Sequence, residues 1–113
     1  MAFGITKEEL NAWKEKASNE EIAFITHYWY DDRFPDCSTV TKAGCKNISK
    51  LKAWGREYGL KPEWIHYRNP FPHFDLLGER QRHILKAEKQ FQQIERFALD
   101  DRTRLKESET RKR

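Results

Sequence analysis

Asn69-Pro70-Phe71-Pro72-His73-Phe74-Asp75-Leu76-Leu77-Gly78 is the stretch of sequence that decides the fold. Its two prolines stiffen the entry, and the apolar residues that follow predict a short strand at about residues 72–77. Because side chains alternate along a strand, His73 and Asp75 are expected to share one face. Gly78 then closes the stretch before a helical pattern begins.

A second strand is predicted at residues 22–29, which are apolar or aromatic at nearly every position. Such a strand suits the middle of a sheet that is covered on both sides. Residues 30–46 are then a long connection, in which residues 38–41 could form a short edge strand.

Three helical segments precede or separate these strands. Thr6 and Glu9 have the spacing of a capping box, which predicts a helix at about residues 7–17. A second helix is expected at 47–58, ending at a glycine, and a single helical turn at 62–65 begins with proline.

A long helix is predicted from about Glu79 to Leu99, because apolar residues recur there at spacings of three and four. This narrow seam could pack on the chain's own sheet or on a second copy, so a homodimer through the C-terminal helix is one prediction. Residues 100–113 are polar, and we expect a disordered tail after a single domain of residues 1–99.

The order of these elements predicts a small α/β sandwich with two or three short strands. The two apolar strands, joined through the helix at 47–58, are expected to be parallel and linked by a right-handed β-α-β crossover. Hydrophobic residues make up only 37% of the chain, so much of the core must come from its 4 Trp, 4 Tyr and 7 Phe.

The net charge of +4 is unevenly placed. Residues 1–78 carry 11 Lys and Arg and 11 Asp and Glu, whereas residues 79–113 carry 11 and 7. A weak contact with nucleic acid is one reading of this basic part, and a solvated helix with a frayed end is the other. The sequence shows no signal peptide and no membrane span, and Cys37 and Cys45 lack a Cys-x-x-Cys spacing, so a cytoplasmic protein with reduced thiols is expected.

Five residues are candidate ligand-binding residues: Asp31, Asp32, Trp64, His73 and Asp75. Asp31 and Asp32 follow the first strand, where ligands of parallel sheets bind, and the pair His73 and Asp75 could hold a divalent metal. Trp64 could stack on a nucleobase. The structural alternatives are a salt-linked turn at Asp31-Asp32-Arg33, a turn cap for His73, and a helix cap or an arginine partner for Asp75. No cofactor other than a divalent metal is indicated.

Four segments together resemble the uncharacterised bacterial YneQ-type family. They are Tyr30-Asp31-Asp32, Lys50 to Gly55, Gly59 to Trp64 and Pro72 to Leu76, and the similarity extends over about residues 22–85. The resemblance implies a compact cytoplasmic domain and brings no established activity. We therefore expect a binding or interaction module. The alternative is a metal-dependent hydrolase acting on nucleic acid or a nucleotide through Asp31, Asp32, His73 and Asp75.

Overall fold

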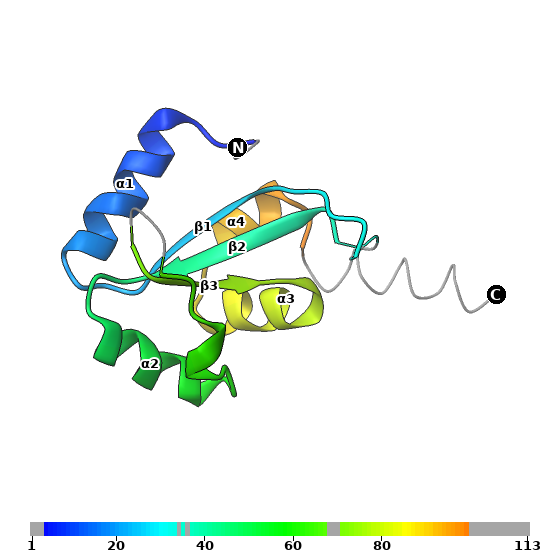
Figure 1. Cartoon of the computed structure of the whole chain (residues 1–113). Helices are drawn as coiled ribbons and strands as arrows, with labels where there is room; N and C mark the ends of the chain where they lie inside the picture. Colours follow the sequence, from blue (N-terminus) through cyan, green and yellow to red (C-terminus); the bar gives the residue numbers. More distant parts are fainter. Residues whose placement is uncertain (1–3, 34, 36, 68–70, 100–113) are drawn as a thin grey trace.

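A computed structural model describes residues 4–33, 35, 37–67 and 71–99 (Figure 1). The chain forms a three-stranded sheet with helices on both faces, which confirms the mixed α/β class. In chain order the elements are α1 (Lys7–Ser18), β1 (Ala23–Tyr28), β2 (Thr39–Gly44), α2 (Ile48–Glu57), the 3-10 helix η1 (Pro62–Trp64), β3 (His73–Leu76), α3 (Gly78–Ala87) and α4 (Phe91–Arg96). The predicted tail of residues 100–113 lies outside the described residues.

The sheet has the order β1-β2-β3, and both pairs of neighbours are antiparallel. One row across it is Thr26, Thr41 and Leu76. The two apolar strands, β1 and β3, run in the same direction, as predicted, but β2 lies between them and is antiparallel to both. The predicted direct β-α-β crossover between them is therefore wrong. The predicted places of two strands are also exchanged, since β1 is at the edge and the segment that begins at residue 39 is central.

A buried polar network explains why a strand as polar as β2 occupies the centre. Thr41 Oγ1 lies 2.6 Å from Thr26 Oγ1 and accepts a hydrogen bond of 2.9 Å from the side chain of Gln81, while Thr39 also donates to Gln81. All four side chains are buried. Since buried hydroxyl and amide groups are tolerated once they are hydrogen-bonded, hydrophobicity alone did not identify the central strand.

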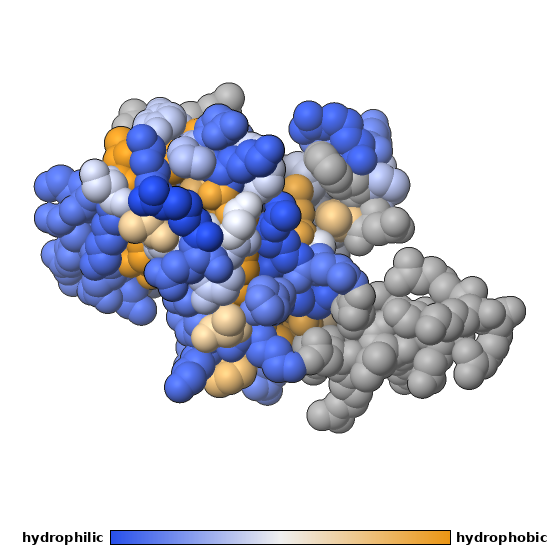
Figure 2. All heavy atoms as spheres, turned by 90° about the horizontal axis from the view of Figure 1, so that it is seen from below, coloured by the Kyte–Doolittle hydropathy of each residue, from blue (hydrophilic) through white to orange (hydrophobic). Residues whose placement is uncertain are grey.

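Each face of the sheet has its own core. Helices α2 and α3 cover the face of Phe74 and Leu76 with buried apolar side chains, and α1 covers part of the other face, where Trp13 and Ala17 pack on β1 (Figure 1). The surface on the side of α2 is mostly hydrophilic, with only small apolar areas (Figure 2). No helix in the described ranges is long and apolar enough to span a membrane.

Local capping signals fix the predicted helix boundaries. The capping box of Thr6 and Glu9 is present at the start of α1, and Asn47 caps α2 by accepting a hydrogen bond from the main chain of Lys50. Helix α2 ends at Glu57, and Gly59, two residues later, has a φ of +73°, the left-handed conformation expected for a glycine after a helix.

The single long helix predicted at residues 79–99 is wrong, because the chain turns sharply between α3 and α4. Lys89 has a φ of +59°, and the main-chain N–H of Gln90 donates to Leu85 O at 2.8 Å, which closes α3 as a glycine would close it. A lysine in the sequence does not predict this conformation, because residues other than glycine seldom adopt it. Helix α4 then folds back, so that Ile94 is buried in its own chain beside Leu85. Phe91 remains 57% exposed, and the packing of a second copy there stays a prediction.

Candidate functional site

Asp31 and Asp32 form the salt-linked turn that was the structural alternative. Asp31 accepts hydrogen bonds from the guanidinium of Arg33, the shortest at 2.6 Å, and this pairing lowers the pKa of Asp31 to about 2. The hydroxyl of Tyr30 donates to Asp32 at 2.7 Å. Both carboxylates are thus occupied within the turn.

The turn at Asp31 and Asp32 is far from His73. In the sheet register His73 is opposite Gly44, which is opposite Ala23 at the start of β1. Asp31 follows the end of that strand, so about eight residues at roughly 3.3 Å each, or about 26 Å, separate the two along the sheet. The prediction that Asp31, Asp32, His73 and Asp75 form one metal-dependent hydrolytic site is wrong, because they lie at opposite ends of the sheet.

His73 and Asp75 do share one face of β3, as predicted, and His66 joins them. The Nε2 atoms of His73 and His66 lie 3.6 and 3.1 Å from the two carboxylate oxygens of Asp75. The two imidazole rings are stacked, with centroids 5.5 Å apart. His66 was missed, since it precedes β3 by seven residues and reaches it only through main-chain hydrogen bonds between His66 and His73.

The tautomer of His73 is fixed by the main chain. Its Nδ1 lies 2.9 Å from Phe71 O, and a carbonyl only accepts, so Nδ1 carries the hydrogen and Nε2 faces Asp75. This bond is the predicted turn cap. In the described part of the chain, no three His, Cys, Asp or Glu side chains are arranged to hold a metal ion. Within the cluster, Asp75 is at hydrogen-bond distance from His66, in place of the predicted arginine or helix cap. The Nε2 of neutral His73 carries no hydrogen and only faces the Asp75 carboxylate.

His27 shares this face of the sheet with His73. Its Nδ1 is 2.9 Å from Tyr28 O, and among the described residues no hydrogen-bond partner reaches its buried Nε2. Burial lowers the pKa of both histidines below its usual value, more than Asp75 raises it, and Lys42 lowers it further. Both rings are thus held in the neutral form.

We predict that the protein loses stability when the pH falls from 7.5 to 5.5. The folded-state pKa of His27 and of His73 is below the unfolded value of about 6.5, so in this range the unfolded chain binds more protons. The stabilising effect is complete above pH 6.5 and is lost as the pH falls through the folded-state pKa. Melting temperatures at the two pH values measure it. His27→Gln and His73→Gln should each reduce the loss, with His83→Gln on exposed α3 as the control; an unchanged loss in both variants would exclude these histidines.

Trp64 lies in η1 and is 41% exposed, with the ammonium of Lys61 5.8 Å and the guanidinium carbon of Arg80 5.1 Å from its ring centroid. Tyr67 is 60% exposed. The structure thus separates the five predicted site residues into three places: the turn at residues 31–32, the β3 cluster of His73 and Asp75, and the surface at Trp64.

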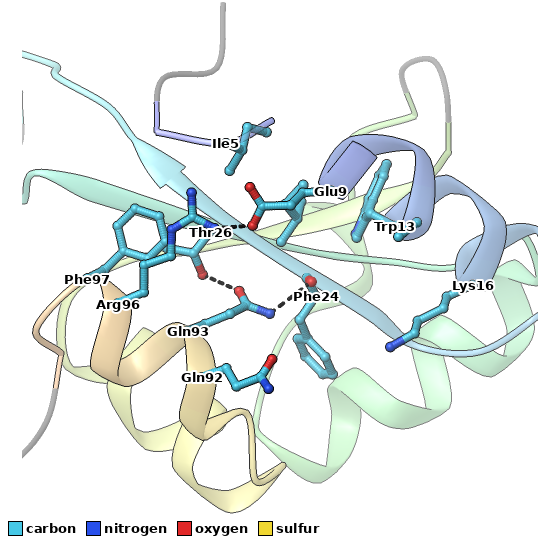
Figure 3. Close-up of a pocket in the computed structure, with 12 residues that line it drawn as sticks. Ile5, Glu9, Trp13, Lys16, Phe24, Thr26, Gln92, Gln93, Arg96 and Phe97 are labelled. Atoms are coloured by element: carbon cyan, nitrogen blue, oxygen red, sulfur yellow. Dashed lines mark hydrogen bonds and ion pairs between the residues drawn. The ribbon is translucent and has the colours of Figure 1, made fainter. Parts of the chain in front are cut away.

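A groove at the other edge of the sheet was not predicted at all. It lies between α1 and α4 over β1 and has a volume of about 270 Å³. Figure 3 shows Glu9, Trp13 and Lys16 on the side of α1, and Gln92, Gln93, Arg96 and Phe97 on the side of α4. Arg96 forms an ion pair with Glu9 and also donates to Gly4 O. The groove exists only because α4 folds back, so no local sequence signal could have revealed it.

The side chain of Gln93 occupies the floor of the groove. Its Nε2 donates to Phe24 O at 3.0 Å, and its Oε1 accepts from Thr26 Oγ1 at 2.6 Å (Figure 3). Thr26 is itself bonded to Thr41, so Gln93 ends the polar network that runs through the sheet. A side-chain amide thus satisfies main-chain and side-chain groups at the outer edge of β1.

These features define a small mixed α/β protein with an aromatic-rich core and a groove beside β1. Over 99 residues, which cover 88% of this chain and the full length of the relative, it is 60% identical to the uncharacterized protein YneQ of Bacillus subtilis (strain 168). The chain belongs to the YneQ family, as the resemblance implied. No protein-family model and no solved structure matches the chain.

Proposed function

We propose that this protein is a binding module that holds an extended peptide in the groove between α1 and α4, as an added strand on β1. The observation that carries the proposal is the position of Gln93. Its amide has the same donor and acceptor as a peptide bond, and its Nε2 donates to Phe24 O, as a main-chain N–H of an added strand would. Binding by strand addition takes its affinity from main-chain hydrogen bonds and its specificity from side-chain pockets.

The direction of the main-chain groups along β1 supports this proposal. The main-chain N–H of Trp29 donates to Ser38 O at 2.9 Å, so the main-chain groups of Trp29 point toward the segment that leads into β2. Along an antiparallel strand, residues whose main-chain N–H and C=O point toward the partner strand alternate with residues whose main-chain groups point away from it. The main-chain groups of Phe24, Thr26 and Tyr28 therefore point away from β2. The contact of Phe24 O with Gln93 agrees with this direction.

The walls of the groove favour a peptide with an acidic end. Trp13 and Phe97 provide apolar contacts, and Arg96 is already paired with Glu9. Lys16 lines the opposite end, and among the described residues no ion pair includes it. Figure 3 shows its ammonium group on the groove side of α1. A carboxylate of the peptide placed there would meet an unpaired positive charge.

The test uses the acetylated peptide Thr-Val-Thr-Val-Thr-Asp with a free C-terminal carboxylate, titrated into the isotope-labelled full chain. We expect saturable shifts of the amide resonances of Phe24, Thr26 and Tyr28 at peptide concentrations up to about 1 mM, which corresponds to roughly −4 kcal/mol. The same peptide with alternate amide nitrogens methylated keeps every side chain and should not bind, because it cannot donate to Phe24 O.

Two pairs of variants sharpen this test. Gln93→Ala should tighten binding about fivefold, since the peptide no longer displaces hydrogen bonds worth about 1 kcal/mol; Gln92→Ala, its neighbour in the groove, should have no such effect. Ala12→Trp should fill the groove and abolish binding, whereas Ala53→Trp, at an exposed position of α2, should not. Equal binding of the methylated peptide, or no shift at β1, would refute the proposal.

A further inference from the structure

The second surface lies beside β3, at the edge of the sheet opposite the groove. We call it the Trp64 patch and define it by Lys61, Trp64, His66, Tyr67 and Arg80. Trp64 and Tyr67 are 41% and 60% exposed, and the side chain of His66 is about half exposed. Three ring-bearing side chains within four consecutive positions are thus accessible to a ligand.

The core does not need these rings. The centre of the fold beside α2 is filled by Trp54, Phe74 and Ile65, all buried. Single exposed apolar residues are ordinary on protein surfaces, but an exposed ring flanked by cations is typical of surfaces on which nucleobases stack. The Trp64 patch is of this second kind, because Lys61 and Arg80 both lie over the Trp64 ring.

Charge is divided across the molecule in a way that matches this patch. Residues 37–67, which contain β2, α2 and η1, carry six Lys and Arg and two Asp and Glu. Residues 4–33, which contain α1 and β1, carry four and seven. A polyanion is therefore attracted to the segment of residues 37–67, which contributes Lys61, Trp64, His66 and Tyr67 to the patch, and is repelled by residues 4–33.

We infer that the Trp64 patch binds single-stranded nucleic acid. Accessible bases present flat faces that can stack on Tyr67 and on Trp64, while Lys61 and Arg80, which flank the Trp64 ring, each contact a phosphate. A duplex hides these faces within its base stack, and an acidic polypeptide offers charge without stacking. The inference is independent of peptide binding in the groove, because the two surfaces lie on opposite edges of the sheet.

The probe is a fluorescein-labelled oligodeoxythymidine of about 20 nucleotides, titrated with the full chain and followed by fluorescence anisotropy at low salt. Trp64→Ala should raise Kd about tenfold, the effect of losing one stacked base. The matched control is Tyr30→Ala, which removes an exposed ring beside Asp31 and Asp32 at the far end of the sheet. The labelled duplex of the same length should bind more weakly than the single strand.

Salt dependence tests the role of the cations. Doubly substituted Lys61→Gln, Arg80→Gln should reduce the slope of log Kd against log salt by about 1.4, because each single-strand phosphate contact contributes about 0.7. Lys7→Gln, Lys14→Gln removes the same charge from α1 and should leave the slope unchanged. Absence of binding at low salt, an equal Kd for Trp64→Ala and the native chain, or equally good competition by poly-glutamate would each overturn the inference.

Discussion

Phe74→Ala should lower the free energy of unfolding by about 4 kcal/mol, and we expect this to be among the largest effects of any single substitution. Phe74 is 1% exposed, and its ring packs against Trp54 with centroids 6.1 Å apart. Truncating a buried phenylalanine costs the transfer of the ring plus the cavity left behind, together about 3–5 kcal/mol. The cavity would lie between β3 and α2, where Gly55 already lets the ring approach the helix closely.

Urea denaturation followed by circular dichroism measures this loss. Phe91→Ala is the control, since the same ring is removed at an exposed position, and it should change stability by no more than about 0.5 kcal/mol. A loss below about 1 kcal/mol at Phe74 would mean that this core does not depend on the ring. If Phe74→Ala fails to fold, Phe74→Leu provides a milder measurement of the same contact.

Gly44→Ala should destabilise the protein by about 2–3 kcal/mol, although it adds only one methyl group. A Cβ at this position would lie 2.5 Å from Trp13 Cζ2 and 3.3 Å from Pro72 O. The indole cannot retreat freely, because its Nε1 donates to Ala23 O at 2.9 Å within the core. Overpacking of this kind typically costs about 1–3 kcal/mol.

A double-mutant cycle distinguishes this clash with Trp13 from a destabilising effect that alanine would have at the end of β2 for any other reason. Trp13→Phe makes room above Gly44, so the two substitutions together should cost less than the sum of their separate effects. Strict additivity would mean that the contact with Trp13 is not the cause. The protein in each case is the full chain, and the measurement is again the free energy of unfolding.

Helix boundaries that depend on interactions between residues close in sequence were predicted correctly. The capping box of Thr6 and Glu9, the cap at Asn47 and the left-handed Gly59 all depend on neighbours within one helical turn. Strand order and direction depend on contacts between distant segments instead. The sequence favoured β1 as the central strand because it is the most apolar, whereas β2 is central because its threonines are hydrogen-bonded to Thr26 and Gln81.

The same difference applies to the surfaces. Alternation along β3 correctly predicted that His73 and Asp75 share a face, but the approach of His66 depends on a main-chain pairing outside the strands. Asp31 and Asp32 were assigned to the site through an assumed parallel sheet, and the antiparallel register removes them from it. The groove depends on the left-handed conformation of Lys89, which turns the chain between α3 and α4. Lysine rarely adopts this conformation, and the neighbouring residues do not predict it.

The position of α4 along β1 has a consequence for behaviour at high protein concentration. An edge strand with unpaired main-chain groups is a template for uncontrolled polymerisation of sheets. Here α1 and α4 stand on either side of that edge and Gln93 occupies part of it, so the rigid sheet of another molecule cannot approach. The edge thus resists aggregation through steric exclusion, without the lysines or prolines that many edge strands use.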